Sequence, residues 1–459
     1  MSKTVHLDEI PYKTDCCELF ERIRSLPGAV LLDSCYPHAK TGRYDILSAE
    51  PEDLELPRLQ ANAGESQCQS FFEELGDFHR EHYAGIKPAS QDIPFCGGLL
   101  GYLSYDMGNG LNQVQPGNID LATVSIPAVQ LRAYDWCAIQ DHLLQRAVLV
   151  TQPDVSPARR RDLLARLRQP ASPAAARFSL AGPFTSNFSQ DSYRQAFERI
   201  QAYIHAGDCY QVNLAQRFSA TCSGDPWAAY RALRSVAAGP FSAFLAMEDD
   251  NAIISLSPER FISLQGHHVQ TSPIKGTRPR YSDPEADRLA AEELCRSAKD
   301  RAENLMIVDL LRNDLGRSCI PGSIHVERLF EMQSFATVHH LVSTISGELR
   351  EDSGPAEVLR NSFPGGSITG APKRRAMEII AELEPHPRQI YCGSVLYISA
   401  DGRMDSNIAI RTLLCQQGQI HCWGGGGIVA DSQWQQEYQE VYDKVGKFLA
   451  TLESMGSQA

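Results

Sequence analysis

Short apolar runs alternate with longer helical segments along this chain, and that alternation most constrains how it folds. In the first 150 residues the apolar runs are bounded by turn residues, as in Ala29–Ser34, Cys96–Tyr102 and Arg146–Val150. Runs of this length and setting are typical of β-strands. From about Ser189 a helical pattern begins, with apolar residues three and four apart from Tyr193 onward. The sequence therefore predicts a mixed α and β fold.

Several elements can be located within this pattern. The segments Pro157–Arg168, Ala298–Arg312 and Gln433–Leu449 are predicted to be helices. Ala252–Leu256 and Phe261–Leu264 are predicted to be two strands of a hairpin. The chain has no repeat of fixed period, which argues against solenoids and propellers.

A stretch rich in proline and alanine, 169–176, is predicted to be a linker or a long surface loop. It places a boundary between an N-terminal region, 1–150, and a longer region, 189–449. The helix and linker occupy 151–188 between them, and 450–459 is a short tail. One large fold in two parts is the expected organisation.

The charge balance excludes one class of function. With 43 Lys and Arg against 56 Asp and Glu, the net charge is −13, and no basic stripe of the kind that binds nucleic acid is visible. An acidic protein that binds an anion needs positive charge concentrated at the site, from a bound cation or a few basic residues.

Cysteine usage and hydropathy bear on location. The chain has 13 cysteines without a Cys-x-x-Cys pair, so neither a zinc site nor a redox motif is predicted. The N-terminus has no apolar core, and no run is as long as a membrane span. We expect a cytoplasmic protein with reduced thiols.

Two pairs of carboxylates share one spacing. Asp300 and Glu303 lie three residues apart in a predicted helix, as do Glu437 and Glu440 in another, so each pair lies on one helix face. Facing helices would bring four hard oxygen donors together, a set that suits Mg²⁺. The competing interpretation is an ordinary solvated helix surface.

Two glycine-rich stretches are candidates for anion binding. Phe363–Lys373 places three glycines and two hydroxyls before a helical segment, but it lacks the spacing of a P-loop. The run Gly424–Gly427 would let a carboxylate contact main-chain amides, because no Cβ obstructs it. A flexible turn is the alternative for such a run.

Four further residues are candidates for chemistry. Arg411, in an apolar strand-like segment, can bind a carboxylate with its fork or form a structural salt bridge. Lys275 would become a nucleophile if burial lowered its pKa, although surface lysines are far commoner. The default interpretation of His340 is a core histidine with satisfied hydrogen bonds. The default interpretation of Glu259 is a salt bridge with Arg260 or another base.

Together these stretches resemble the chorismate-utilising enzymes, which include anthranilate, aminodeoxychorismate, isochorismate and salicylate synthases. The resemblance covers roughly 189–449 and rests on five stretches in the family's order: Ser257–Phe261, Ala302–Leu310, His340–Ser343, Gly370–Lys373 and Gly425–Val429. The N-terminal part resembles the family's accessory region through Leu31–Ser34, Ala49–Pro51 and Ser104–Asp106. The resemblance implies an α/β body of two stacked antiparallel-rich sheets flanked by helices, with chorismate and Mg²⁺ in the cleft between them.

The resemblance also implies roles for individual residues. Glu303 and Glu440 would coordinate Mg²⁺, with Asp300 and Glu437 nearby. The implied chorismate-binding residues are Gly276, Thr277, His340, Tyr397, Arg411, Gly425, Gly426 and Gly427.

Within the family, Pro-Ile-Lys-Gly-Thr marks the enzymes that aminate chorismate at carbon 4, whereas anthranilate synthases typically have alanine at the lysine. In the implied mechanism the Lys275 amine attacks carbon 2 while Mg²⁺ and the acid Glu259 assist departure of the carbon 4 hydroxyl. Ammonia then adds at carbon 4, expels the lysine and gives 4-amino-4-deoxychorismate for 4-aminobenzoate and folate. The chain has no amidotransferase nucleophile motif, so ammonia is expected from a separate glutamine amidotransferase subunit in a heterodimer.

Two departures from the family pattern and three alternative functions stay open. Leu396 stands where relatives have glycine, which would crowd the pocket or shift Tyr397, and the segment before Pro240 lacks an asparagine. A tryptophan pocket is a weaker expectation, formed by Ser34, Arg43, Tyr44, Pro240, Phe241 and Ser242. The alternative functions are an anthranilate synthase component I, an isochorismate synthase and a non-catalytic, tryptophan-binding regulatory subunit.

Overall fold

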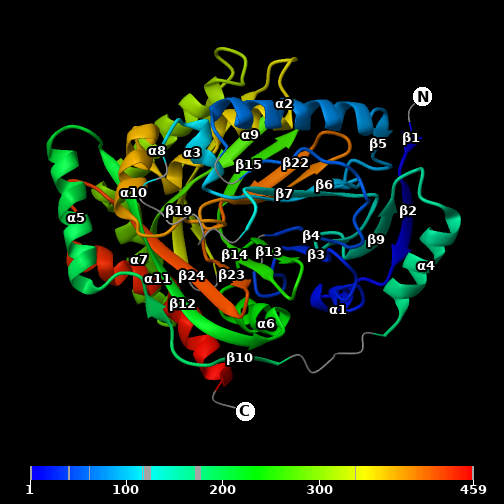
Figure 1. Cartoon of the computed structure of the whole chain (residues 1–459), viewed down its shortest axis with the longest axis horizontal. Helices are drawn as coiled ribbons and strands as arrows, with labels where there is room; N and C mark the ends of the chain where they lie inside the picture. The colour runs from blue at the N-terminus through cyan, green and yellow to red at the C-terminus, as the bar shows by residue number, and fades with distance from the viewer. Residues whose placement is uncertain are drawn as a thin grey trace.

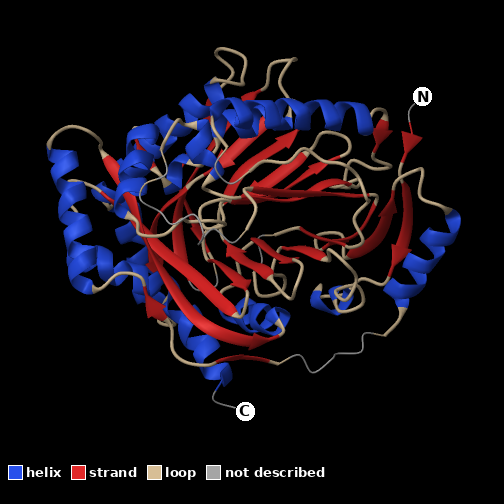
Figure 2. Cartoon of the chain, in the orientation of Figure 1, coloured by secondary structure: helices blue, strands red, loops and turns tan. Residues whose placement is uncertain are grey.

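The computed structural model describes residues 3–39, 42–60, 63–115, 117, 126–170, 177–335 and 338–456. Two large sheets lie one above the other and helices cover their outer sides (Figures 1 and 2). The neighbouring strands in both sheets are antiparallel, so the predicted fold class is confirmed. Within these residues, no helix has the length and apolar character needed to cross a bilayer.

The larger sheet has 13 strands. Its strands, in spatial order, are β10 (Phe178–Leu180), β12 (Gln211–Gly224), β24 (Gln419–Ile428), β23 (Thr412–Gln416), β14 (Ala252–Ser257), β13 (Phe241–Ala246), β3 (Val30–Asp33), β4 (Tyr44–Ser48), β8 (Trp136–Asp141), β9 (Arg146–Thr151) and β2 (His6–Ile10), with β11 (Thr185–Ser186) and β20 (Gly370–Ala371) paired to β12.

The second sheet has nine strands. Its order is β17 (Ile274–Pro279), β19 (Val338–Glu348), β16 (His268–Ser272), β15 (Arg260–Gln265), β22 (Met404–Asn407), β21 (Ser394–Ser399), β6 (Gly98–Leu103) and β7 (Val129–Tyr134), with β18 (His325–Ser334) paired to β19. The short strands β1 (Lys3–Thr4) and β5 (Ile86–Lys87) form a separate parallel pair.

Helices pack on the outer faces of the sheets (Figure 1). In the described part of the chain they are α1 (Cys17–Phe20), α2 (Glu65–His82), α3 (Met107–Leu111), α4 (Pro157–Arg168), α5 (Gln190–His205), α6 (Pro226–Val236), α7 (Pro284–Arg296), α8 (Ala298–Gly316), α9 (Pro355–Ser362), α10 (Lys373–Leu383) and α11 (Trp434–Gly456), with a 3₁₀ turn, η2, at Gly366–Ile368.

Alternating side chains on β3 belong to two different apolar clusters. Val30 of β3 joins the large apolar cluster that residues of both sheets share, whereas its neighbour Leu31 joins a second cluster with Trp227 of α6. This alternation is the period of two expected of a strand buried on both faces. The space between the sheets is therefore closely packed except where polar residues line a cavity.

The predicted hairpin is wrong. β14 pairs with β13 and β23 in the larger sheet, whereas β15 pairs with β16 and β22 in the smaller one. The intervening Pro258 has no N–H to donate to a ladder, and the chain crosses between the sheets there. This crossing brings Glu259 into the space between the two layers.

Both predicted regions contribute to both sheets. Strand β3 of the N-terminal region pairs with β13, and β6 pairs with β21. The predicted helix at 157–168 has the expected bounds, whereas 171–176 of the predicted linker lies outside the described residues. The C-terminal helix was predicted to end at Leu449, but α11 continues to Gly456.

Candidate functional site

Lys275 and Glu259 meet beside the 3₁₀ turn η2. The Nζ of Lys275, on β17, donates a hydrogen bond of 2.9 Å to the carbonyl oxygen of Ser367. Glu259 is only 4% exposed, and its carboxyl is hydrogen-bonded to the Ser367 side chain and to the backbone of Ile274. Three segments distant in sequence thus converge on one amine and one carboxyl group.

Burial pushes both groups toward their uncharged forms. It raises the pKa of Glu259 to about 7, although Ser367, Lys275 and the Ile274 backbone favour the carboxylate. Solvent reaches part of the Lys275 side chain, but the protein surrounds its amine, and the pKa of Lys275 is lowered by burial against the attraction of Glu303 and Glu259. Both shifts favour the forms that the chemistry needs, because a general acid must carry its proton and a nucleophilic amine must be free of it.

Helices α8 and α11 bring the two carboxylate pairs toward one another. Ser297 caps α8 by accepting a hydrogen bond from the backbone N–H of Asp300, which begins the helix just before the first pair. The Nζ of Lys299 lies 3.9 Å from a carboxylate oxygen of Glu303 and 3.6 Å from one of Glu437. The space between the helices therefore already holds one cationic group.

A second amine lies at Glu440. The Nζ of Lys444 is 2.7 Å from the Glu440 carboxylate and donates to the carbonyl oxygen of Gly425. Burial tends to raise the pKa of Glu440, but Lys444, Lys299 and Lys275 together outweigh burial and the net pKa is lowered. For Glu303 and Glu437, burial is the largest cause and the pKa is raised.

These carboxylates suit a hard cation. They are oxygen donors on facing helices, and burial raises the pKa of Glu303 and Glu437, so a bound cation would stabilise their ionised forms. Asp300 faces the same region but also accepts a hydrogen bond of 3.1 Å from Arg278. Within the described ranges, the tighter groups of metal-ligating side chains are elsewhere, at Asp15, Cys16 and Cys17 and at Cys16, Asp33 and Asp45.

Gly276 lies in β17, next to Lys275, at a point where this strand approaches α8 closely. Its φ of +84° is favourable only for glycine, and a Cβ there would come 3.1 Å from the side chain of Asp300. The next residue, Thr277, hydrogen-bonds through Oγ1 to Nδ1 of His340 at 2.8 Å. Lys275, Thr277 and His340 therefore belong to one surface.

His340 has a buried ring nitrogen without a hydrogen-bond partner among the described residues. The residue is 2% exposed, and no polar atom in the described part of the chain bonds to its Nε2. Burial, together with the charge of the nearby Arg411, lowers the pKa of His340 to about 3. The ring is therefore neutral, and the default interpretation as a fully satisfied core histidine is wrong for this residue; His339 bonds to Ser334 and Asp287 instead.

Arg411 lies at a break in strand pairing. It has a φ of +50° and immediately precedes β23, so it is not inside a strand as predicted. No carboxylate among the described residues pairs with its guanidinium, whose pKa is lowered by burial alone. A buried cation without a partner is costly, so an anionic ligand would stabilise it.

The second glycine run is a strand and not a flexible turn. Gly424–Gly427 belongs to β24, which pairs with β12 along its whole length. Strand β23 pairs with β24 only as far as Cys422, so among the described strands the other edge of the glycine run has no partner. A Cβ on Gly426 would lie 3.1 Å from Glu437 and 3.7 Å from Glu440. Its absence lets the main chain approach the acidic helix.

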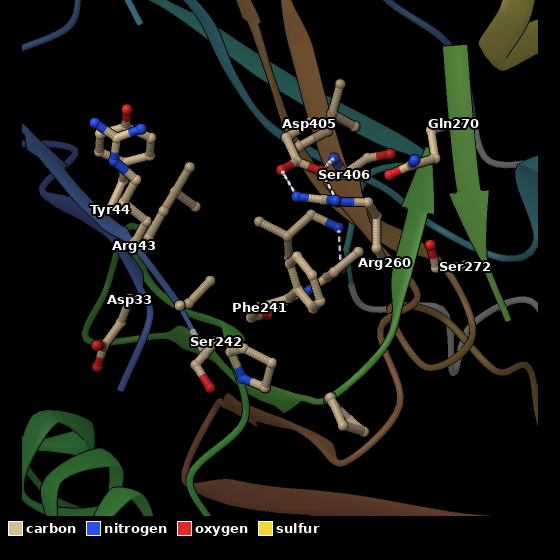
Figure 3. A pocket seen from close by; sticks show the side chains of 18 of the residues that line it. Asp33, Arg43, Tyr44, Phe241, Ser242, Arg260, Gln270, Ser272, Asp405 and Ser406 are labelled. Carbon is tan, nitrogen blue, oxygen red and sulfur yellow. Dashed lines mark hydrogen bonds and ion pairs between the residues drawn. The ribbon is translucent and has the colours of Figure 1, made fainter. Parts of the chain in front are cut away.

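Five of the six residues of the predicted tryptophan pocket line a cavity of about 500 Å³ between the sheets (Figure 3). Arg43, Tyr44, Pro240, Phe241 and Ser242 line it. Ser34 is not among its lining residues, because its hydroxyl donates to Asp45 at 2.7 Å inside the sheet.

Tyr397, which is predicted to contact chorismate, and Leu396, a departure from the family pattern, also line this cavity. Arg260 is in the cavity wall too, and its guanidinium binds both carboxylate oxygens of Asp405 at 2.9 Å. The alternative interpretation of Glu259, a salt bridge with Arg260, is therefore wrong for these two described residues, because Arg260 pairs with Asp405. Ile274 and Pro258 complete part of the wall, so the cavity adjoins the Lys275 site.

Sequence reasoning missed three residues of the site. Ser367 holds Lys275 and contacts Glu259, and the amines of Lys299 and Lys444 lie beside the four acids. Ser367 was visible only as one of two hydroxyls in a glycine loop. The two lysines follow the acids at helical spacing, four residues before Glu303 and four after Glu440, which was a usable signal.

Comparison with known proteins identifies this architecture. The family model described as chorismate binding enzyme matches residues 33–450. The chain is 46% identical over 451 residues to aminodeoxychorismate synthase component 1 of Klebsiella aerogenes, covering 97% of this chain and 98% of that protein. It is 38% identical over 378 residues to anthranilate synthase component 1 of Thermus thermophilus, covering 81% of this chain and 80% of that protein.

Solved structures agree in fold. Anthranilate synthase component I of Streptococcus pneumoniae superposes with a TM-score of 0.74 at 28% identity, covering 89% of this chain and 93% of that one. The menaquinone-specific isochorismate synthase of Escherichia coli has a TM-score of 0.72 at 17% identity, covering 98% of this chain and 95% of that one. The second likeness concerns the fold alone.

Proposed function

The chain belongs to the family of chorismate-binding enzymes, and from this premise we propose that it aminates chorismate at carbon 4. The product is 4-amino-4-deoxychorismate, a precursor of 4-aminobenzoate and folate. Relatives named aminodeoxychorismate synthase component 1 match nearly the whole chain at 46% and 45% identity, whereas the anthranilate synthase relative matches less of it at lower identity.

One observation carries the chemical proposal: a lysine whose pKa is lowered by burial lies near a glutamic acid whose pKa is raised by burial, and both contact Ser367. Lys275 Nζ is 2.9 Å from its carbonyl acceptor, and burial raises the pKa of Glu259 to about 7. Most of the Glu259 population can thus donate a proton slightly below neutral pH, while the lowered pKa of Lys275 increases the fraction of free amine.

The proposed reaction proceeds in two displacements. The Lys275 amine forms a bond to carbon 2, the ring double bonds shift, and the carbon 4 hydroxyl leaves as water with the proton of Glu259. Ammonia then attacks carbon 4, the double bonds return and the lysine nitrogen departs as a neutral amine. The Glu259 carboxylate accepts the excess proton from the new ammonium group, which restores the starting state.

Substrate anchoring is assigned to the groups that have no protein partner. Arg411 and the main chain of Gly425–Gly427 would bind the enolpyruvyl carboxylate, since a guanidinium fork and free amides both bind carboxylates. Thr277 and the neutral His340 would contact the ring. Glu303 and Glu440 would hold Mg²⁺, with Asp300 and Glu437 beside them, and the ion would neutralise the ring carboxylate of chorismate.

The proposal includes a partner and a location. We assign the ammonia supply to a glutamine amidotransferase subunit, because relatives are named as component 1 of a synthase. A cytoplasmic location fits the thirteen free cysteines. Tryptophan is a candidate for the cavity lined by Arg43, Tyr44 and Phe241, and calorimetry with about millimolar tryptophan tests it, since absence of heat would remove the idea.

Product analysis tests the proposed function. The purified chain is incubated with chorismate, Mg²⁺ and an ammonium salt at alkaline pH, and products are separated and weighed by mass spectrometry. We expect 4-amino-4-deoxychorismate, and a protein adduct on Lys275 when ammonia is omitted. Fluorescent anthranilate, isochorismate or no turnover would each replace the proposal with one of the alternative functions.

A further inference from the structure

Arg388 is a fully buried cation that lies behind the reaction site. It is 1% exposed, and its Nε and Nη2 donate to the two carboxylate oxygens of Glu384 at 2.9 and 2.7 Å. Its remaining hydrogen bonds go to backbone carbonyls, from Nη1 to Ile368 at 3.0 Å and from Nη2 to Asn213 at 2.8 Å. One guanidinium thus binds a carboxylate and two main-chain segments.

The segment held at Ile368 also holds Lys275. Ile368 directly follows Ser367, whose carbonyl oxygen accepts the hydrogen bond from Lys275. On its other side, the carbonyl of Thr369 accepts from the backbone N–H of Asn213 at 2.8 Å. The η2 segment and strand β12 thus contact each other through Thr369 and Asn213, and Arg388 donates a hydrogen bond to each of these two segments.

A motif of the N-terminal region packs around the same arginine. The guanidinium carbon of Arg388 lies 4.6 Å from the ring centroid of Tyr105, a cation–π distance. Asp106 accepts a hydrogen bond of 2.8 Å from the backbone N–H of Gln389, and the N–H of Tyr105 donates to the Gln389 carbonyl. The Ser104–Asp106 stretch, which none of the proposed catalytic steps uses, thus immobilises Arg388.

We propose that Arg388 is a positioning residue for the Lys275 nucleophile, fixing the Ser367 carbonyl through its hydrogen bond to the adjoining Ile368. A carbonyl oxygen can accept from the Lys275 amine but cannot protonate it. While one N–H points at Ser367, the nitrogen lone pair points away from it. The direction of the lone pair is therefore set by the direction of the carbonyl, and a displaced turn misdirects the attack.

Lysine cannot replace this arginine. A planar guanidinium reaches three acceptor groups in fixed directions, whereas an ammonium on a flexible chain cannot maintain the same geometry. Small displacements in an active site lower turnover strongly, because the reacting atoms must meet at near-contact distance. This inference rests on the proposed amination and assigns a role within it.

The test compares Arg388→Lys with a matched control, Arg234→Lys. Arg234 is also a buried arginine bound to a carboxylate, Asp33, and to a main-chain carbonyl, that of Tyr36, but its bonds do not reach the η2 segment. Measurements are kcat and KM for chorismate with ammonium, the rate of Lys275 adduct formation without ammonia, and the unfolding midpoint of each protein.

For Arg388→Lys we expect kcat and the adduct rate to fall together by about tenfold to a hundredfold, with KM within about threefold of the wild type. Arg234→Lys should lower the unfolding midpoint and leave the adduct rate unchanged. An Arg388→Lys protein with the wild-type adduct rate, or with a loss no greater than that of the control, would overturn the role.

If Arg388→Lys does not fold, Tyr105→Leu decides the question. That change removes the ring beside the guanidinium and leaves every hydrogen bond of Arg388, so a severalfold loss of adduct rate supports positioning and an unchanged rate refutes it. Failure of the proposed function is distinguishable, because the wild-type protein would then make no 4-amino-4-deoxychorismate.

Discussion

Replacing Glu259 with glutamine should stabilise the protein at alkaline pH while abolishing its activity. Glutamine has nearly the same shape, so the contacts with Ser367 and Ile274 can be kept, but it has no acid proton and never becomes charged. Glu259 is 4% exposed. When the pH rises and its carboxyl group ionises, water cannot solvate the negative charge in the folded protein, and the folded state is destabilised.

The magnitude follows from the pKa. Burial raises the pKa of Glu259 from 4.5 to about 7, and each unit of pKa is worth about 1.4 kcal/mol. Because the folded pKa is the higher one, the favourable contribution is fully present below pH 4.5 and is lost as pH rises through about 7. At pH 8 the wild-type protein has lost about 3 kcal/mol by this effect, of which about 2 kcal/mol disappears between pH 5.5 and 8.

Urea unfolding of the wild type and of Glu259→Gln at pH 5.5 and 8 measures this difference. We expect the stability of the variant relative to the wild type to increase by about 2 kcal/mol between the two pH values. Glu81→Gln, at an exposed glutamate of α2, is the control for the chemical change. Equal stability differences at both pH values, or a variant less stable than the wild type at pH 8, would refute the assignment of a raised pKa.

Activity gives an independent reading of the same carboxyl group. Glu259→Gln should lose about 10²- to 10⁴-fold in kcat, the usual contribution of a general acid. Wild-type kcat/KM should fall on the alkaline side of about pH 7, as the acid with that pKa ionises in the free enzyme. An unchanged alkaline limb in Glu259→Gln would show that another group donates the proton.

Three further substitutions address the other groups of the site. Lys275→Ala should form no covalent adduct with chorismate, and full turnover by this variant would exclude the lysine as nucleophile. Arg411→Lys should raise KM for chorismate by about tenfold to a hundredfold, the value of a charged hydrogen bond, and an unchanged KM in steady-state kinetics would mean that the carboxylate binds elsewhere. Glu303→Gln should raise the Mg²⁺ concentration that restores half of the activity after chelation, and a metal titration superimposable on the wild type would contradict its role as a ligand.

Local sequence rules predicted the helices well. The helix predicted at 298–312 begins at Ala298 because Ser297 caps it, and its buried residues follow one face from Asn304 to Leu315. Such signals act within a few residues and need no knowledge of the remaining chain. The four acids that share two helix faces were found in this way.

Strand pairing was not predicted by the same rules. β14 and β15 are neighbours in sequence and have the apolar character of a hairpin, yet they belong to different sheets. Each is buried by elements far along the chain, β23 for one and β22 for the other. Apolar patterning identifies a strand, but its partners depend on which surfaces the whole chain can cover.

The surroundings of Tyr397 also depend on tertiary structure. The Tyr397 side chain lies in the wall of the cavity with Arg260 and Phe241, and its predicted contact with chorismate stays a prediction. A strand side chain points to one of two faces, and the register with β6 and β22 selects the face.

The order of residues along the chain shows which reactive groups are present and at what spacing: a lysine before Gly276, an acid after Pro258, paired acids on two helices and an arginine before β23. The tertiary structure alone decided their protonation and direction. Lys275 meets its acceptor across 92 positions of sequence, and the pKa of Glu259 depends on burial by both sheets and on neighbours remote in the chain. A pKa reports the free energy of a charge in its surroundings, and only the folded chain supplies those surroundings.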